Sequence, residues 1–440
     1  MSDLAIGYWS FPVLLLLIFL RLPIGLSMLM VGILGNYLIR GNWMPILAQF
    51  KDMPYSSFAS YSLSIVPLFL LMGLFATSGG MSKALFKSAE TWMGHFKGGV
   101  AIATIGACAG FGAICGSSLA TAATMGQVAL PELKRNGYSS ALSTGAVAAG
   151  GTLGILIPPS VILVVYAIVA EQNIAKLFVA AFVPGILAAV GYMIAINVYV
   201  RLVPDSATSR PKASLRERFQ SLLAVWPVML IFAAVVGGIY LGVFTPTEAA
   251  AVGAVATGLL SYLNGGLNFA GLKSAIFSTA SATGMIFFIV LGAAVYNSFL
   301  AISLLPQELA SQIVSLGLNP WWVLTGILLF YLVMGCFMDS LSMVLLTIPI
   351  FFPMVSSLDF GVPPAEFGLW FGVLVLIVVE VGLITPPVGM NLFIINAMDV
   401  LTPIRETYRG VLPFVVSDIV RTVLLAAFPV LSLFAVRALF

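Results

Sequence analysis

Apolar residues fill long stretches of this chain, and short polar segments separate them along its whole length. The runs reach about 17–25 residues, the length that a helix needs to cross the hydrocarbon core of a membrane. They predict about ten full membrane spans. We expect these spans near residues 4–20, 23–39, 59–78, 137–170, 179–200, 219–242, 246–264, 276–298, 364–397 and 410–436.

Two of the predicted spans contain a proline pair that interrupts them. Pro158-Pro159 follows Gly154, and Pro386-Pro387 follows Gly382, which lies 228 positions later (382 − 154 = 228). Proline removes a backbone donor and clashes with the preceding turn, so each pair predicts an unwound joint. Lipid cannot satisfy the backbone groups of such a joint, so it has to lie inside protein or line a polar cavity. Matched broken spans in two halves of a membrane chain indicate a transporter's binding site.

Two further segments are expected to form re-entrant helical hairpins. Residues 98–135 and 319–357 each have two short apolar legs joined by a polar tip. The tips are residues 112–118, which end in Ser117-Ser118, and residues 335–340, which end in Asp339-Ser340. An apex this polar does not suit contact with lipid.

The order of span, hairpin, broken span and span occurs twice, which predicts two structural repeats. Ser118 matches Ser340 at an offset of 222 (340 − 118 = 222), and Pro131 matches Pro353 at the same offset. The predicted first repeat is 1–202, with scaffold spans in 1–79 and 179–202, an arm helix at 80–97, a hairpin at 98–135 and a broken helix at 137–170. A cytoplasmic connector is predicted at 203–217. The predicted second repeat is 218–440, with scaffold spans in 218–298 and 410–436, an arm at 300–316, a hairpin at 319–357 and a broken helix at 364–397.

The charges of the loops predict that the two repeats are inverted in the membrane. Lys134 and Arg135 lie at the base of the first hairpin, whereas no Lys or Arg occurs between Lys273 and Arg405. Positive charge marks the cytoplasmic side, so the hairpins enter from opposite sides. Mixed segments at 172–178 and 267–275 are predicted, like the arms, to lie in the interface.

Composition limits the classes of function that remain. Of 440 residues 61% are apolar and 8% charged, against about 25% charged in soluble domains. The net charge of +3 is small, so nothing indicates nucleic acid. A single histidine and three cysteines in apolar runs leave no His-based triad or metal cluster, and no phosphate-binding loop occurs.

Several motifs together resemble the large membrane subunit of tripartite ATP-independent periplasmic (TRAP) transporters. They are residues 116–126 and 131–138, Gly154 to Ser160, Thr245-Pro246-Thr247-Glu248, Pro353, and Gly382 to Phe393. The resemblance covers essentially the whole chain, and departs from the family in the loop at residues 362–364. It implies a sodium-driven elevator transporter that imports an organic anion such as a C4-dicarboxylate across the bacterial inner membrane. It also implies two partners, a periplasmic substrate-binding protein and a small membrane subunit of about four spans.

Helix ends at the tips and joints are the predicted binding groups. Helix N-termini suit a carboxylate, and unwound carbonyls and C-termini suit Na⁺, the predicted co-transported ion. The candidates for substrate are Ser117, Ser118, Ser160, Ser340, Thr385 and Asn391, and those for sodium are Ser117, Gly154, Pro158, Asp339, Gly382, Thr385 and Pro386.

Some of these polar residues also have a structural interpretation. Ser117, Ser118 and Asp339 are suited to capping the second legs of the hairpins. Glu380 is either a coupling carboxylate or a buried structural group. We interpret residues 245–248 as a capping box.

Two other functions remain open from the sequence. A self-sufficient sodium–dicarboxylate symporter with related two-hairpin architecture would transport without a binding protein. An intramembrane enzyme would need a paired nucleophile and base, which Ser117 or Asp339 alone does not supply. The sequence therefore predicts an all-α polytopic transporter and no enzyme.

Overall fold

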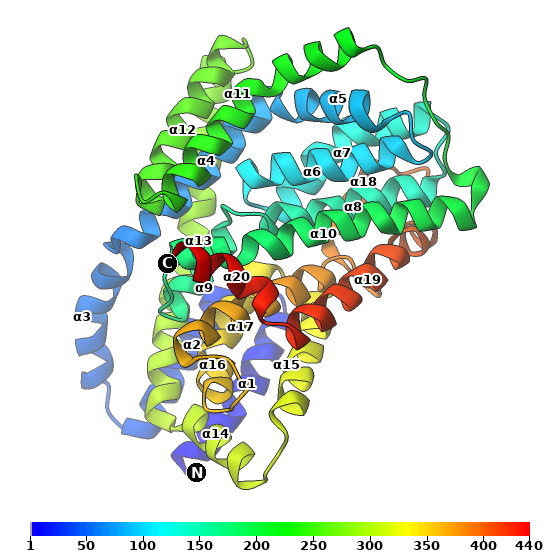
Figure 1. Ribbon diagram of the computed structural model, residues 1–440. Helices are drawn as coiled ribbons and strands as arrows, with labels where there is room; N and C mark the ends of the chain where they lie inside the picture. The colour runs from blue at the N-terminus through cyan, green and yellow to red at the C-terminus, as the bar shows by residue number, and fades with distance from the viewer. Residues whose placement is uncertain (1) are drawn as a thin grey trace.

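A computed structural model describes residues 2–440, and each regular element in that range is helical (Figure 1). The first half contains α1 (Asp3–Phe19), α2 (Ile24–Arg40), α3 (Met44–Phe58), η1 (Tyr61–Ser64), α4 (Ile65–Ser78), α5 (Met81–Met93), α6 (Gly99–Cys115), α7 (Ser118–Arg135), α8 (Ser140–Leu156), α9 (Val161–Val169), α10 (Ile174–Leu202) and η2 (Pro204–Ser206). The second half contains α11 (Leu215–Tyr240), α12 (Pro246–Leu263), α13 (Phe269–Ser303), α14 (Leu305–Ser315), α15 (Pro320–Gly335), α16 (Ser340–Ser356), α17 (Pro364–Gly382), α18 (Met390–Met398), α19 (Ile404–Ala427) and α20 (Val430–Leu439).

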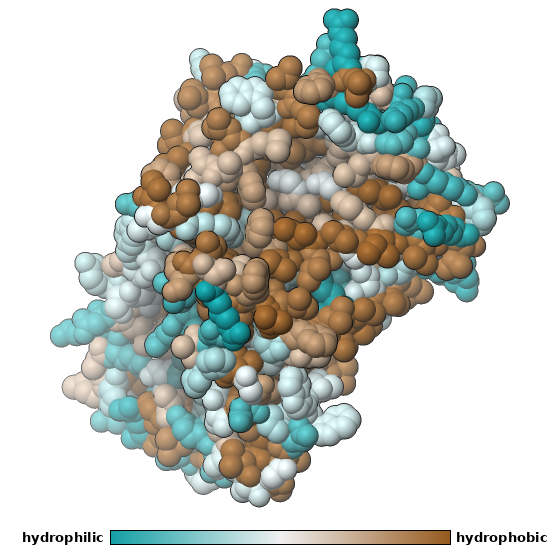
Figure 2. Space-filling view, viewed as in Figure 1, coloured by the Kyte–Doolittle hydropathy of each residue, from teal (hydrophilic) through white to brown (hydrophobic). Residues whose placement is uncertain are grey.

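Several of these helices are long and apolar enough to cross a membrane. Six satisfy that condition alone, and the bent pair α8 and α9 makes a seventh. Shorter apolar helices such as α1 and α2, at 17 residues each, account for other predicted spans. Apolar residues cover much of the visible surface, while hydrophilic residues gather toward its opposite ends (Figure 2). The chain is therefore a multi-pass membrane protein.

Both hairpins are present, and the residues at their tips explain where the helices end. Gly116 closes α6 with a left-handed φ of +64°, and Ser117 accepts a hydrogen bond from the Ala120 amide as the N-cap of α7. In the second hairpin Asp339 accepts a hydrogen bond from the Ser342 amide as the N-cap of α16. Side-chain caps of this kind satisfy amides that a helix leaves free at its start.

Both predicted helix breaks are confirmed. The joint between α8 and α9 contains Pro158-Pro159, and the two helices bend by 46° across it. The joint between α17 and α18 is longer and contains Pro386-Pro387. In each case the proline pair lies where the helical hydrogen bonding stops.

Packing between the two halves has the reciprocal pattern expected of repeats related by a two-fold axis. Helix α2 packs against α13, and α4 of the first half packs against α12 of the second. In the same way α7 packs against α18, and α16 packs against α9. Each broken helix also contacts the first leg of its own hairpin, α8 with α6 and α17 with α15. The hairpins and broken helices therefore form one interlocked group.

The structure corrects several expected elements. Helix α3 was not predicted, because Lys51, Asp52 and Pro54 interrupt the apolar pattern of its sequence. The segments 172–178 and 267–275 are not separate interfacial helices, since they form the first turns of α10 and α13. The arm at 300–316 is divided between the end of α13 and α14 at Leu304, which has a φ of +57°. The span at 410–436 is two helices, α19 and α20, separated at Phe428-Pro429.

The capping box predicted at residues 245–248 is confirmed. Thr245 accepts from the Glu248 amide, while the Glu248 side chain accepts from the Thr245 amide at 2.8 Å. A second capping box, Ser214 with Glu217, starts α11. Both fix where a scaffold helix of the second half begins.

Candidate functional site

A cavity of about 130 Å³ lies where the two hairpin tips meet. The first residues of α7, α9 and α16 line it, namely Ser118, Val161 and Ser340. Its wall is completed by Leu70 on α4 and Ile286 on α13. Three helix N-termini therefore meet at one small space.

The predicted candidates are brought together only in part. Ser117, Ser118, Asp339 and Ser340 all line the cavity. Ser160 is fully buried and caps α9, directly before the cavity residue Val161. The tips thus supply most of the polar groups that face the cavity.

Two predicted substrate residues lie outside the described wall of this cavity. The Thr385 hydroxyl donates to the Val381 carbonyl at 2.6 Å, one turn earlier. The Asn391 amide donates to the Ala148 carbonyl at 3.3 Å, and its own side-chain oxygen has no partner. In this arrangement Asn391 joins α18 to α8.

The predicted sodium candidates divide into tip residues and residues near the joints. Gly154 and Gly382 pack against the first legs of the hairpins, and Pro158 and Pro386 lie in the two joints. Within residues 2–440 no cluster of three or more His, Cys, Asp or Glu side chains is positioned to hold a metal ion. A cation in this region would therefore need carbonyl and hydroxyl oxygens in addition to any single carboxylate such as Asp339. The Thr121 hydroxyl is one such oxygen; it is buried and has no hydrogen-bond partner.

Asp339 caps a helix and also faces the cavity. One carboxylate oxygen accepts from the Ser342 amide at 3.1 Å, and the other accepts from the Ser342 hydroxyl at 2.5 Å. Asp339 therefore does cap the second leg of its hairpin, as its structural interpretation predicts. Its position in the cavity wall leaves its charge available there as well.

Glu380 contacts both tips. This residue of α17 is fully buried, and it accepts hydrogen bonds from the hydroxyls of Ser118 and Ser340. The bond from Ser340 measures 2.7 Å. Glu380 does not line the cavity itself, so it lies behind the two serines.

Sequence reasoning missed a buried charged group on α19. Asp418 and Arg421 form an ion pair of 2.8 Å and are 1% and 6% exposed. The Tyr192 hydroxyl donates to Asp418 at 2.7 Å and contacts the Thr152 hydroxyl at 3.0 Å. Asp and Arg three residues apart inside a predicted span are costly in a membrane and were the signal that could have identified this cluster.

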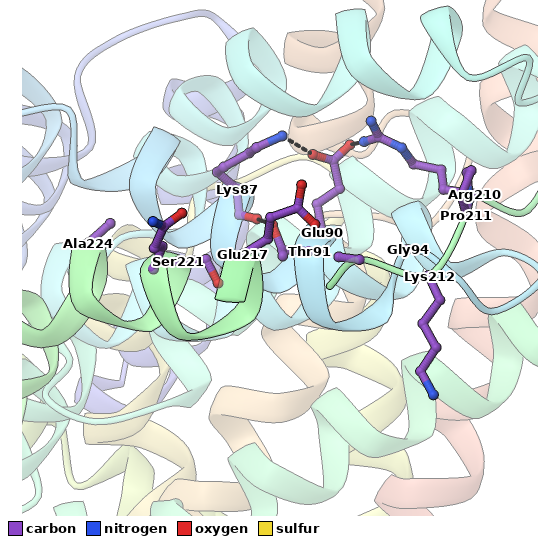
Figure 3. A pocket seen from close by; sticks show the side chains of 12 residues that line it. Lys87, Glu90, Thr91, Gly94, Arg210, Pro211, Lys212, Glu217, Ser221 and Ala224 are labelled. Carbon is purple, nitrogen blue, oxygen red and sulfur yellow. Dashed lines mark hydrogen bonds and ion pairs between the residues drawn. The ribbon is translucent and has the colours of Figure 1, made fainter. Parts of the chain in front are cut away.

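A larger pocket of about 680 Å³ lies elsewhere, where α5, the 203–214 segment and α11 meet (Figure 3). Glu90 is its buried centre and pairs with both Lys87 and Arg210. Glu217 also lines the pocket, and the hydrogen bonds it accepts from Ser214 lower the pKa of its carboxyl group. These charges largely satisfy one another and connect the arm helix to the connector, so this pocket is a poor candidate for the transport site.

An all-helical membrane fold, two hairpins, two broken helices and a small cavity between the tips define a transporter permease. Comparison with known proteins gives the family. Residues 11–431 match the family described as "Tripartite ATP-independent periplasmic transporter, DctM component". The chain belongs to this family, the large permease subunits of TRAP transporters.

Relatives with different named substrates align over most of the chain. The C4-dicarboxylate TRAP transporter large permease protein DctM of Pseudomonas aeruginosa is 37% identical over 375 residues, covering 85% of this chain and 86% of that protein. The sialic acid TRAP transporter large permease protein SiaM of Vibrio cholerae is 32% identical and covers 95% of each chain. The ectoine TRAP transporter large permease protein TeaC of Halomonas elongata is 31% identical, covering 95% of this chain and 96% of that protein.

A solved structure shares the fold. The YdaH transporter of Alcanivorax borkumensis superposes with a TM-score of 0.65 over 98% of both chains. The sequences are only 13% identical, so this likeness concerns the fold alone.

Proposed function

We propose that this chain imports an organic anion across the bacterial inner membrane, coupled to sodium, and receives its substrate from a periplasmic binding protein. The substrate class is a carboxylate, such as a C4-dicarboxylate. The named substrates of the three relatives differ, but each contains a carboxylate group. The proposal therefore names the chemistry that they share and leaves the particular acid to experiment.

The observation that carries this proposal is the meeting of three helix N-termini at one cavity. Helix N-termini present free amide groups and the positive end of the helix dipole, and together they favour an anion. No Lys or Arg occurs among the described residues that line the cavity. A carboxylate would be held by amides and dipoles, without a fixed cation.

Sodium coupling is supported by charge balance in the same cavity. Asp339 contributes a carboxylate to the wall, and an anionic substrate beside it adds further negative charge. A co-bound cation removes this repulsion. The unpartnered Thr121 hydroxyl and the carbonyl of Ser117 both lie beside Gly154 and offer oxygen ligands for such an ion.

Elevator motion is supported by the composition of the cavity wall. The tips and broken helices supply one side, while Leu70 and Ile286 come from α4 and α13, which pack in the reciprocal scaffold pairs. We propose that the hairpins and broken helices slide as one block past those scaffold helices. The end of the first hairpin that carries Lys134 and Arg135 would face the cytoplasm.

The test is reconstituted uptake in liposomes. We expect this chain with a small membrane subunit and a binding protein to accumulate a labelled C4-dicarboxylate only when sodium is higher outside. Omitting the binding protein should abolish saturable uptake. Normal saturable uptake without the binding protein would instead identify a self-sufficient symporter.

A further inference from the structure

One carboxylate serves both hairpin tips in this molecule. The Ser118 and Ser340 hydroxyls donate to different oxygens of Glu380, one from each hairpin. The two serines are 1% and 3% exposed, and the carboxylate is fully buried. Each tip is therefore held by a group that also holds the other tip.

The repeats themselves would not produce this arrangement. The offset of 228 that relates the two proline joints places Thr152 opposite Glu380 (152 + 228 = 380). The Thr152 hydroxyl contacts the Ala149 carbonyl and the Tyr192 hydroxyl, and within residues 2–440 it makes no hydrogen bond to either tip. The acceptor is therefore present in one repeat only, and both tips depend on it.

The direction of these hydrogen bonds decides what each tip offers the cavity. A serine hydroxyl has one hydrogen and two lone pairs. Because that hydrogen is donated to Glu380, only lone pairs remain to face the cavity. Lone pairs suit a cation, whereas a substrate carboxylate accepts hydrogen bonds and gains nothing from them.

We propose that Glu380 is a positioning residue. Its single carboxylate accepts a hydrogen bond from the serine of each hairpin tip, which holds both tips in place and orients the lone pairs of their hydroxyls toward the cavity. This inference rests on the proposed function for its sodium consequence. Ser118 and Ser340 then contribute to cation binding, and the substrate carboxylate is bound by the amides of the helix N-termini. The serine side chains would then bind the ion, although their position alone indicates that they bind the substrate.

The first test measures hydrogen exchange of the tip amides and needs no transport. In the full chain, Glu380→Ala should raise exchange about tenfold at both tips, residues 112–121 and 335–344, because each loses a charge-assisted hydrogen bond. Glu380→Gln keeps the shape of the side chain and should give a smaller rise, again at both tips. Ser118→Ala and Ser340→Ala should each affect mainly their own tip.

The matched control is Thr152→Val at the repeat-equivalent position. It removes a buried hydroxyl but no described tip contact, so tip exchange should stay unchanged. A rise at only one tip, or at neither, in both Glu380 variants would overturn the shared-acceptor assignment. The same rise in Thr152→Val would show general loosening and would overturn it too.

The second test separates sodium from substrate. In Glu380→Gln the amide nitrogen is a donor, so one serine hydrogen has to turn away from residue 380. The sodium concentration for half-maximal substrate binding should rise about tenfold. The dissociation constant of the substrate, measured at saturating sodium, should change less than about twofold. Weaker substrate binding by Glu380→Gln with an unchanged sodium dependence would show that the serines bind the substrate, and would overturn the inference. If wild-type binding needs no sodium, the proposed function fails, while the exchange result still decides whether Glu380 holds both tips.

Discussion

Gly112 lies so close to Gly154 that a Cβ atom added to Gly112 would stand 2.5 Å from the Gly154 Cα atom. The second repeat has the corresponding contact, since a Cβ added to Gly382 would stand 2.6 Å from the Gly335 Cα atom. Each broken helix therefore meets the first leg of its own hairpin backbone to backbone, directly beside the tip. Small residues permit such close helix contacts in membranes.

Adding one methyl group at this contact should destabilise the protein. Gly112→Ala should lower the free energy of unfolding by about 1–3 kcal/mol, because backbone atoms cannot move aside as a flexible side chain does. Thermal unfolding of the purified protein in detergent measures this. Gly110→Ala is the control in the same helix, since its Cβ would meet Leu85 at an ordinary 3.4 Å. Equal melting temperatures for the two variants would contradict the close packing.

Asp339 variants separate its two roles. Asparagine caps a helix about as well as aspartate, so Asp339→Asn should fold normally while uptake requires more sodium. Asp339→Ala should lose about 1 kcal/mol of stability through the missing cap as well. Uptake measured against sodium concentration, at equal protein abundance, checks both. An unchanged sodium dependence in Asp339→Asn would reduce Asp339 to a helix cap.

Removing Arg421 should be more damaging than removing the whole buried ion pair. Arg421→Met leaves Asp418 charged and buried, which costs about 3–5 kcal/mol in comparable buried pairs. The double variant Asp418→Leu with Arg421→Met removes both charges and should recover part of that loss. Unfolding of the single and double variants measures the difference. A double variant less stable than Arg421→Met would contradict this prediction.

The sequence predicts those parts of the fold that depend on local chemistry. The proline pairs fix the two joints, Ser117 and Asp339 mark the second legs, and the capping box at Thr245 marks the start of α12. Each of these signals acts within a few residues, so it can be read without knowing the fold. The predicted domain division follows from the same signals and stays a prediction.

The contacts that build the site could not be predicted in this way. Glu380 is separated from Ser118 by 262 positions and from Ser340 by 40, and no local pattern relates them. Thr385 directly precedes the second proline pair and Asn391 follows it closely, yet the longer joint places both away from the cavity wall. Only the tertiary packing that brings both hairpin tips to Glu380 on α17 determines which polar groups meet.

Elevator transport requires that the tip cavity moves relative to the scaffold. Ser117 at the first tip and Leu70 on α4 line the cavity together in this state. Cysteines at these two positions, in a background without Cys108, Cys115 and Cys336, should form a disulfide in one state only. We predict that this cross-link arrests sodium-driven uptake and that reduction restores it. Uptake at the uncross-linked rate with the disulfide intact would contradict sliding of the tips past the scaffold.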